Sequence, residues 1–507
     1  MLKLFAKNRY TPLFIFAVLY ILFALFSYKA WPIANGEEFR YLRGKETLEH
    51  LLHGEFTELL VQPLPNHFLY NGYTALLTFL NPNFYYEWFH LINLVFSVTI
   101  FVFVYLFALE LFKETKWATL SLVTLILFPT FFGQMAINPV DMPFAAFYLA
   151  ALYAIYKFGK GKHLAPYQIA ILGILFGISQ GLRQLGLGLY ILLFLYQLLL
   201  EKNLFKLIKK RFFEYLLIFV VANFFMVITW PNFAVNYFKS FAWYLSIGKD
   251  FFLWDFGLLF GGEILTNSER PQYYLPLFQL ITSPVFVVVF FGFAIRFFNT
   301  LKKNHAFTLL SLAFVLNYLL YFVLNPVLYD GTRHFLYLLP IISLLSLTGL
   351  KMALEKSKNK TVKTSLIVLV ILNFVFLGKR TIETFPYHYV YFNEAASILG
   401  NPYHLYESDY SSTLYKPATE WIRDIYIPEN NITNLKVYAC DNGYAVDYYS
   451  HKKFQVVLDT EEADLIICDY RTLKGFKGGR KTSGEIIYEV GYENTPITYI
   501  FSKKPNY

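Results

Sequence analysis

The sequence has little of what a soluble protein of this length contains. Charged residues make up only 16% of its 507 positions, against about 25% in a typical soluble domain. Its two cysteines, Cys440 and Cys468, both lie near the C-terminal end, so no disulfide or zinc framework holds the rest of the chain together. What the chain has instead is 56% hydrophobic and 20% aromatic residues, a composition that favours a lipid bilayer.

Apolar stretches long enough to cross a hydrocarbon core of about 30 Å recur along the first three quarters of the chain. No internal repeat, low-complexity segment or Pro/Gly linker divides this region. We therefore expect a polytopic α-helical membrane protein with about eleven transmembrane helices. The expected spans are 11–28, 89–112, 117–133, 143–158, 167–182, 184–200, 212–230, 274–297, 307–325, 334–352 and 362–378.

Lysine and arginine residues fall on alternate connections between these spans. Short cytoplasmic loops are enriched in such residues, so this set marks the inside and predicts a cytoplasmic N-terminus. The first segment has no small-residue cleavage site and is expected to stay as an anchor. The net charge of +9 is then a consequence of topology, and nucleic-acid binding is not expected. The basic connections are those at 3–9, 113–116, 157–162, 202–211, 302–303 and 351–363.

The run 167–200 is almost unbroken in its hydrophobicity. As one helix it would be roughly 50 Å long, too long for a single crossing. Both flanks are basic, so the run must cross twice and turn outside near "SQGLRQLG", with Arg183 at the turn. The resulting odd number of spans places the chain beyond about residue 385 outside the membrane.

The C-terminal part changes character. Five short β-rich runs, "NLKVYAC", "FQVVL", "ADLIIC", "GEIIYEV" and "ITYIFS", follow a helical pattern in "STLYKPATEWIRDIY". We expect a membrane domain over 1–384 and a small extracytoplasmic α/β domain over 385–507. Cys440 and Cys468 end two of its predicted strands; a bridge is within reach, but two buried free thiols are favoured for an isolated pair.

Several polar residues lie at the predicted outer ends of spans. Ionisable groups near the hydrocarbon boundary are costly unless they face a cavity or one another, so the set indicates a site on the outer face. For any one of them a plainer role is open, such as anchoring a helix end or, for Asp141, capping a helix. The set is Glu37, Glu38, Asp141, Arg183, Glu263, Arg270, Arg333 and His334.

The loop after the first span is more than a connection. In "EEFRYLRGKETLEHLLHGEF", Tyr41, Leu48, Leu51 and Leu52 share one helical face, as in a helix lying on the membrane surface. A second short apolar segment, "NHFLYNGYTALLTFL", follows "VQPLPN" and is also expected to be interfacial. Together they predict an outer loop that covers the helix bundle.

These motifs resemble the polyprenyl-phosphate-dependent glycosyltransferases of the GT-C superfamily, the group of protein O-mannosyltransferases and the lipid A aminoarabinose transferase. Their first outer loop carries an Asp-Glu pair, often as G-D-E-x-x-Y, which Glu37, Glu38 and Tyr41 match with Glu in place of Asp. "NPVDMPFAAFYLAALY" is similar to the second acidic loop, and "TRHFLYLLPIISLL" to the helix start whose arginine approaches the lipid phosphate. A His-Pro-Pro or basic feature of that first loop is replaced by "QPLPNH", so His67 is a weak candidate.

The resemblance implies an integral-membrane glycosyltransferase in the plasma (inner) membrane. It would move a hexose or pentose from a polyprenyl-phosphate donor to a hydroxyl of a glycan, lipid or protein acceptor on the extracytoplasmic side. A carboxylate would take the acceptor proton, and guanidinium groups would hold the phosphate, with inversion at the sugar carbon. No cofactor is expected, dependence on a divalent metal stays open, and membrane lipids surround the protein. The implied catalytic residues are Glu37 and Asp141, and the implied substrate-binding residues are Glu38, Tyr41, Arg183, Glu263, Arg333 and His334.

Two other classes of protein stay open at this point. A solute transporter or lipid flippase is also polytopic, but it typically shows internal repeats and polar residues near the bilayer midplane, whereas these residues lie at helix ends. A non-catalytic assembly or sensor protein could use the outer domain for binding alone.

Overall fold

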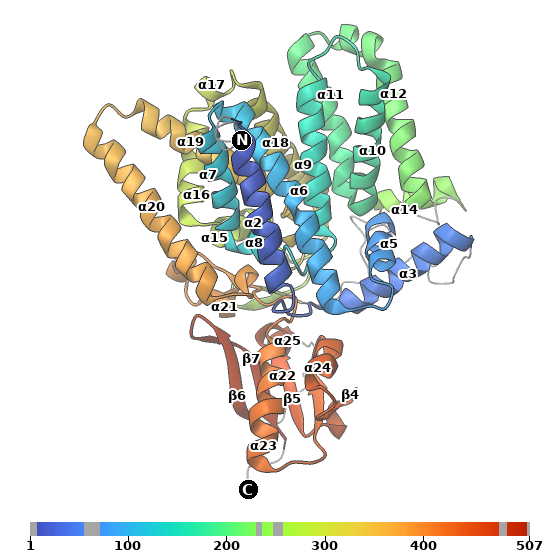
Figure 1. Cartoon of the computed structure of the whole chain (residues 1–507), viewed down its shortest axis with the longest axis vertical. Coiled ribbons are helices and arrows are strands. Elements are labelled where there is room, and N and C mark those ends of the chain that lie inside the picture. The colour runs from blue at the N-terminus through green and yellow to red at the C-terminus, as the bar shows by residue number, and fades with distance from the viewer. Residues whose placement is uncertain (1–7, 55–70, 230–235, 247–256, 476–483, 504–507) are drawn as a thin grey trace.

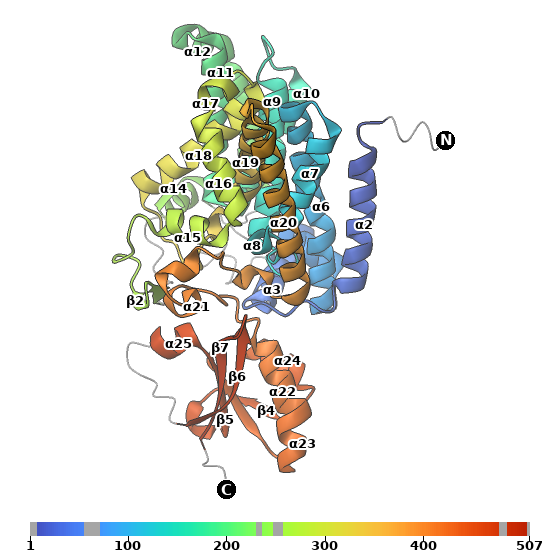
Figure 2. The same ribbon diagram turned by 90° about the vertical axis from the view of Figure 1, so that its left-hand side faces the viewer.

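A computed structural model describes residues 8–54, 71–229, 236–246, 257–475 and 484–503 of the chain. It is mostly helical, with a bundle of apolar helices above a small unit that contains a β-sheet (Figures 1 and 2). His67 lies outside the described residues, as does the first part of the expected second interfacial segment.

Each expected span coincides with helix. By length and composition alone, five helices among the described residues could cross a membrane, or six if one bent pair is counted as a single span. The expected total of eleven crossings therefore stays a prediction. The helices are α2 (Thr11–Ser27), α6 (Tyr86–Phe112), α7 (Thr115–Ile126), α8 (Pro129–Phe132), α9 (Asp141–Phe158), α10 (Pro166–Leu182), α11 (Gly188–Glu201), α12 (Leu204–Thr229), α15 (Tyr274–Thr282), α16 (Val285–Arg296), α17 (Phe298–Leu301), α18 (His305–Leu324), α19 (Leu338–Lys356) and α20 (Lys360–Glu383).

The expected hairpin within 167–200 is confirmed. Helix α10 ends at Leu182, Arg183 is extended, and a short 3-10 helix at Gln184–Leu187 leads into α11. Arg183 therefore lies at the turn between the two helices, at the end of the bundle that faces the C-terminal unit (Figure 1).

The expected span at 274–297 is not one continuous helix. It consists of two helices, α15 and α16, which are bent by 119° relative to each other. Pro284 explains the break, because a residue before proline avoids helical geometry and Ser283 is accordingly extended with ψ of 142°. The short α15 thereby stays near the outer end of the bundle, beside the loops of the site described below.

Two short helices cover the outer end of the bundle near α12. Helix α3 (Glu37–His53) and helix α5 (Asn71–Leu80) pack against each other at Gly44, where a Cβ atom would lie 2.3 Å from the Thr78 hydroxyl oxygen. Only glycine permits this approach. A third short helix, α14 (Tyr237–Ser246), packs nearby through the buried Tyr244, whose hydroxyl donates to the Gln180 carbonyl at 2.9 Å.

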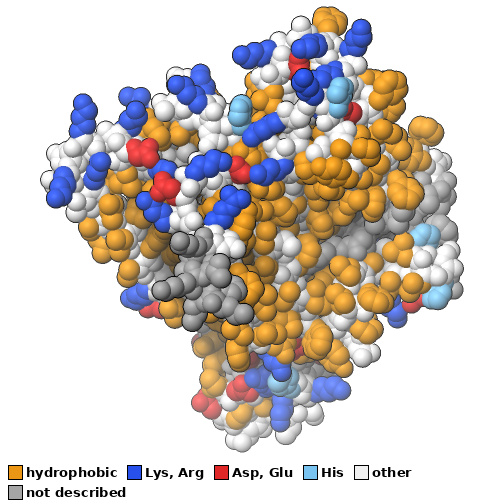
Figure 3. Space-filling model, turned by 45° about the horizontal axis from the view of Figure 1, so that its top comes forward, with side chains coloured by type: hydrophobic (Ala, Val, Ile, Leu, Met, Phe, Trp, Pro, Cys, Tyr) orange, Lys and Arg blue, Asp and Glu red, His pale blue; other side chains and the backbone are white. Residues whose placement is uncertain are grey.

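Basic side chains gather over the end of the bundle opposite the C-terminal unit (Figure 3). Several of them pair with acidic side chains. Lys113 lies 2.7 Å from Glu110, three residues before it, and Lys351 lies 2.8 Å from Glu114 of another connection. Broad orange surfaces of hydrophobic side chains flank this end, and α20 is the most exposed of the candidate spans, with 11% of its apolar window buried against 83% for α19.

The C-terminal unit contains a five-stranded sheet in the order β4-β3-β5-β7-β6. Strand β3 pairs in parallel with β4 and β5, while β7 pairs antiparallel with β5 and β6. All five predicted strands and the predicted helix are present, and two unpredicted short helices join them. The elements are α22 (Tyr415–Trp421), a π-helical turn (Ile422–Tyr426), α23 (Ile427–Asn430), β3 (Lys436–Ala439), α24 (Gly443–Ser450), β4 (Gln455–Val457), β5 (Leu465–Asp469), α25 (Tyr470–Gly475), β6 (Glu485–Tyr492) and β7 (Thr495–Ser502).

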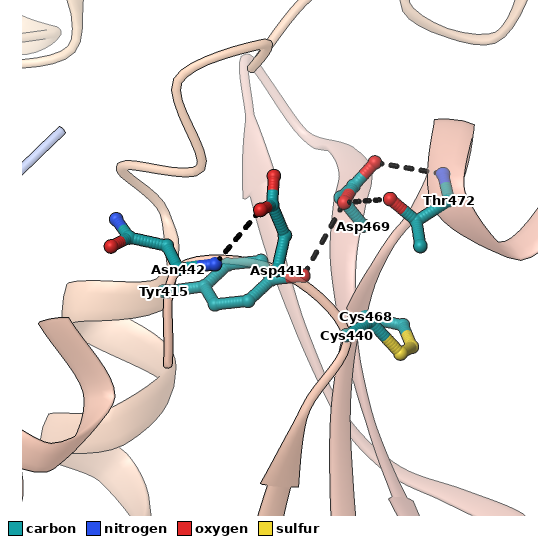
Figure 4. Close-up of a disulfide and its surroundings, with 7 residues drawn as sticks. All are labelled: Tyr415, Cys440, Asp441, Asn442, Cys468, Asp469 and Thr472. Atoms are coloured by element: carbon teal, nitrogen blue, oxygen red, sulfur yellow. Dashed lines mark hydrogen bonds between the residues drawn. A yellow bond between two sulfur atoms is a disulfide. The ribbon is translucent and has the colours of Figure 1, made fainter. Parts of the chain in front are cut away.

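The two cysteines form a disulfide, so the expectation of free thiols is wrong. Cys440 follows β3 and Cys468 lies in the adjacent parallel strand β5, which brings their Cα atoms to 5.1 Å. Figure 4 shows the bridge beside the ends of both strands. The pairing depends on the register of two strands that are 28 residues apart in sequence, which local sequence patterns do not reveal.

Candidate active site

A buried carboxylate binds two arginines at the end of the helical bundle that faces the C-terminal unit. Asp141, the first residue of α9 and only 2% exposed, forms ion pairs with Arg183 of the α10–α11 turn and with Arg333, whose Nε lies 3.7 Å from Asp141 Oδ2. Asn138 orients the carboxylate: its side-chain amide donates to Asp141 Oδ2 at 2.9 Å. The Asp141 backbone N–H in turn donates to Asn138 Oδ1 at 2.9 Å.

The two guanidinium groups keep unused hydrogen-bond donors. The Nε atoms of Arg183 and Arg333 are buried and have no hydrogen-bond partner within the part of the chain that the structure describes. Nε2 of the buried His334 is also without one, and the positive charges of both arginines act on its ring. The Arg183 and Arg333 side chains are 13% and 16% exposed, whereas the Asp141 side chain is 2% exposed. Cationic groups with spare hydrogen-bond donors, held together on one carboxylate, have the chemistry of an anion site.

Arg333 is also held from its own loop. Asp330 Oδ2 lies 2.7 Å from Arg333 Nη1, and the Tyr329 ring lies 5.3 Å from the guanidinium carbon. An ion pair of this kind is the structural alternative to ligand binding for a charged residue at the end of a membrane helix. It engages Nη1 of the guanidinium, while Nε faces Asp141 at 3.7 Å and makes no hydrogen bond to the described residues. Asp330 lies three residues before Arg333 in "DGTRHF", so this ion pair is a local contact.

Glu37 occupies a different environment. Its side chain is fully buried at the start of α3, and both carboxylate oxygens lie 3.1 Å from Nε2 of His90, which is equally buried in α6. The Ala34 backbone N–H donates to Glu37 Oε1 at 3.0 Å. His90 was missed in the sequence, although it is the one histidine inside the apolar run 89–112.

Glu38 and Tyr41 lie on the same helix as Glu37. The Tyr41 hydroxyl donates to the Pro82 carbonyl at 2.7 Å, and its ring stacks on Phe84 with centroids 4.2 Å apart. Burial raises the pKa of the Glu38 carboxyl, and the nearby charge of Asp447 in the C-terminal unit raises it further. Tyr41 therefore anchors α3 to the following loop, while Glu38 faces the C-terminal unit.

One loop links the Asp141 and Glu37 environments. Tyr410 accepts a hydrogen bond from Gln134 at 3.0 Å, and Gln134 in turn accepts one from Asn138, the partner of Asp141. One residue later, the Ser411 carbonyl accepts from the Asn35 backbone N–H at 2.9 Å, two residues before Glu37. Segment 407–413 thus joins the two carboxylate environments to each other and to the C-terminal unit.

Two predicted site residues lie elsewhere. Glu263 is exposed in β2 (Glu263–Leu265), which forms a hairpin with β1 (Leu258–Phe260). Arg270 is buried, but its guanidinium donates to the Tyr321 hydroxyl at 2.7 Å, to Asn325 Oδ1 at 2.9 Å and to the Pro326 carbonyl at 2.9 Å, so it holds the end of α18. Neither is in contact with Asp141 or Glu37. Among the described residues, no cluster of three or more His, Cys, Asp or Glu side chains could hold a metal ion.

Comparison with known proteins gives a structural match without a sequence match. No protein-family model and no curated protein sequence matches the chain. Among solved structures, ArnT from Cupriavidus metallidurans bound to undecaprenyl phosphate superposes with a TM-score of 0.50 at 11% identity, over 96% of this chain and 98% of that one. The oligosaccharyltransferase of Archaeoglobus fulgidus matches with a TM-score of 0.46 at 11% identity, over 91% of this chain and 69% of that one.

The likeness to ArnT extends over the helical bundle and the C-terminal unit together. The chain is a membrane protein with the GT-C fold, as the sequence motifs predicted.

Proposed function

We propose that this chain is an integral-membrane glycosyltransferase that takes a sugar from a polyprenyl-phosphate donor. The observation that carries the proposal is the pair Arg183 and Arg333: two partly exposed guanidiniums, each with an unused donor, held on one buried carboxylate in a GT-C fold. The solved ArnT structure of this fold has undecaprenyl phosphate bound. A lipid phosphate presents the oxygen acceptors that such donors need.

In this proposal Asp141 serves the phosphate site indirectly. Its carboxylate is already engaged by Arg183, Arg333 and Asn138, so it orients the two arginines rather than contacting the acceptor. Arg183 and Arg333 bind the phosphate oxygens, with His334 beside them. The negative charge that develops on the phosphate as the sugar leaves is stabilised by cations that are already in place.

Glu37 is the proposed general base. Within the described part of the chain it has no arginine partner, and His90 holds it at the start of α3. The acceptor oxygen attacks C1 of the sugar as the C1–phosphate oxygen bond breaks; the acceptor proton goes to Glu37, and the bond electrons leave with the polyprenyl phosphate. Attack on the face opposite the phosphate inverts C1. Because Glu37 is fully buried, this role requires α3 to move and admit the acceptor.

We place this site outside the cytoplasm of a cell bounded by a plasma (inner) membrane, with the basic end of the bundle inside and about eleven helices crossing the bilayer. Single cysteines introduced at 204–210 or 355–360 should then react with a membrane-impermeant reagent only from the cytoplasmic side. A cysteine introduced near residue 429, in the exposed end of α23, should react only from the outside. Labelling of that position from the cytoplasm contradicts the proposed orientation.

The activity is tested directly by incubating the purified protein with a panel of polyprenyl-phosphate sugars and measuring released polyprenyl phosphate. A transferase releases it in an acceptor-dependent reaction that the Glu37→Gln variant does not catalyse. A flippase moves the lipid across a vesicle membrane with the sugar still attached, and an assembly protein does neither. Either of the last two results contradicts the proposal.

A further inference from the structure

One arginine of the C-terminal unit reaches into the membrane part of the site. Arg471 Nη1 lies 3.0 Å from Asp330 Oδ1 and 3.5 Å from Glu407 Oε1, and the Arg471 side chain is 15% exposed. Asp330 belongs to the loop before α19, so this contact joins positions 141 residues apart. Nothing in the local sequence of "DYRTLKG" marks this arginine as part of the site.

Two sets of contacts hold Arg471 close to the loop that contains Asp330. Arg471 lies on α25, directly after β5, where Asp469 accepts hydrogen bonds from the backbone N–H of Thr472 at 3.0 Å and from its hydroxyl at 2.6 Å (Figure 4). Tyr470 stacks on His404 with centroids 4.3 Å apart, and Lys474 donates to the Gly262 carbonyl at 3.0 Å. Helix α25 is therefore docked on two loops of the membrane part.

Asp330 is shared between two arginines. One oxygen pairs with Arg471 and the other, at 2.7 Å, with Arg333. Asp330 and Gly331 both have positive φ, 58° and 61°, a conformation that costs an aspartate about 1 kcal/mol or more. Glu407 accepts from the Gly331 backbone N–H at 3.2 Å and so helps to fix this turn. The turn that presents Arg333 is therefore held by groups from outside it.

We propose that Arg471 is a positioning residue of the phosphate site, so that the C-terminal unit completes the site formed by the membrane helices. Arg471 fixes Asp330 and its left-handed turn, and Asp330 fixes the direction of the Arg333 guanidinium. This inference rests on the proposed function, because it assigns Arg333 to the donor phosphate. Arg471 itself does not contact the phosphate.

The chain offers a matched control at the same boundary. Arg380 at the end of α20 also pairs with the C-terminal unit, through Glu493 in the β6–β7 turn, and its Nη2 donates to the Phe392 carbonyl at 2.9 Å. Like Arg471, Arg380 is largely buried and bridges the helices to the sheet unit. Among the described residues its ion-pair partners are Glu394 and Glu493 and include neither Asp330 nor Arg333, so Arg380→Met removes a docking contact and leaves the Arg333 turn intact.

The experiment measures equilibrium binding of undecaprenyl phosphate to the full-length protein, with thermal stability recorded for each variant. We expect Arg471→Met to weaken binding by about tenfold, a typical coupling between linked sites. Arg380→Met should bind like wild type while losing a similar amount of thermal stability. Because Arg333 also stabilises the charge that develops on the leaving phosphate, turnover of Arg471→Met at saturating donor should fall as well, whereas turnover of Arg380→Met should stay near that of wild type.

The outcomes separate the two claims. If Arg471→Met binds like wild type, or if both variants are weakened equally, the positioning role is wrong. If Arg333→Ala itself binds undecaprenyl phosphate like wild type, the phosphate assignment of the proposed function is wrong instead. Should Arg471→Met not fold, Arg471→Lys keeps the charge but not the planar guanidinium, so it should weaken binding by less than tenfold; unchanged binding overturns the inference.

Discussion

The two acidic residues singled out for catalysis, Glu37 and Asp141, have nearly the same burial and entirely different partners. Asp141 holds two arginines that keep unused donors. Glu37 is paired with a single histidine and one backbone N–H. The first arrangement stabilises negative charge next to the carboxylate, and the second leaves a carboxylate without fixed cations. Glu37 and Asp141 are both carboxylates and are buried to a similar extent. Only their partners distinguish the proposed phosphate site at Asp141 from the proposed general base Glu37.

The largest effect is expected from Glu37→Gln. The amide keeps the shape and can still pair with His90, but it cannot accept the acceptor proton. Turnover should fall by about 10²–10⁴-fold, the usual effect of losing a general base. Folding, measured by thermal unfolding, should change little. Turnover near the wild-type rate in this variant would assign the base elsewhere, and Glu38→Gln is then the next variant to assay, since Glu38 keeps a buried oxygen without a hydrogen-bond partner among the described residues.

The next largest effect is expected from replacing Arg333 in the Asp141 environment. Arg333→Ala removes a charged donor from the phosphate site, and each such hydrogen bond contributes about 1.5–3 kcal/mol. Affinity for a polyprenyl phosphate, measured by titration, should therefore fall about tenfold to hundredfold. Arg333→Lys keeps the charge without the guanidinium fork and should fall in between. If Arg333→Ala loses thermal stability but keeps its affinity, the arginine serves only its ion pair with Asp330.

A smaller effect is expected from the partner of Glu37. His90→Leu leaves a buried carboxylate without its side-chain partner, which costs about 1–3 kcal/mol of unfolding free energy. Replacing both residues, in Glu37→Leu/His90→Leu, removes the unpaired group and should recover most of that stability. Denaturant or thermal unfolding in detergent measures both variants. A double variant as unstable as the single one would show that His90 stabilises the fold by packing alone.

The smallest effect is expected from Asp409, in the segment 407–413 that links the Asp141 and Glu37 environments. Burial raises the pKa of the Asp409 carboxyl from its ordinary value of 3.8 to about 6. The folded state then holds this proton more tightly than the unfolded state, so the contribution of Asp409 to stability rises as the pH falls from about 6 toward 4. Thermal unfolding between pH 4 and 7 should show this slope in wild type. Asp409→Asn should flatten it, and an unchanged slope in that variant would remove Asp409 as its source.

Much of this architecture follows from sequence patterns with a simple physical origin. Hydrophobic length placed helix at every expected span, and alternating basic loops placed Arg183 at a turn between α10 and α11. Period-two patterns placed all five strands of the C-terminal unit. These signals are local, because each depends on burial or solvation of a single segment.

What the sequence could not show is which distant segments meet. The pairing of Cys440 with Cys468 depends on strand register, the break at Pro284 divided an expected span, and Glu263 proved to be exposed on a hairpin. His90 and Arg471 lie 53 and 141 residues from their partners Glu37 and Asp330. Their roles arise only after the chain has folded, so neither residue type nor local spacing marks them.

The most direct test of the account compares two conservative variants in two assays. Glu37→Gln and Asp141→Asn are each measured for undecaprenyl phosphate binding and for turnover with a polyprenyl-phosphate sugar. The account predicts that Glu37→Gln binds the lipid phosphate like wild type and fails in turnover, while Asp141→Asn, which loses the charge that holds Arg183 and leaves Arg333 held from its own loop, loses affinity for the lipid phosphate. Normal lipid-phosphate affinity in Asp141→Asn together with lost affinity in Glu37→Gln would reverse the two assignments and contradict the account.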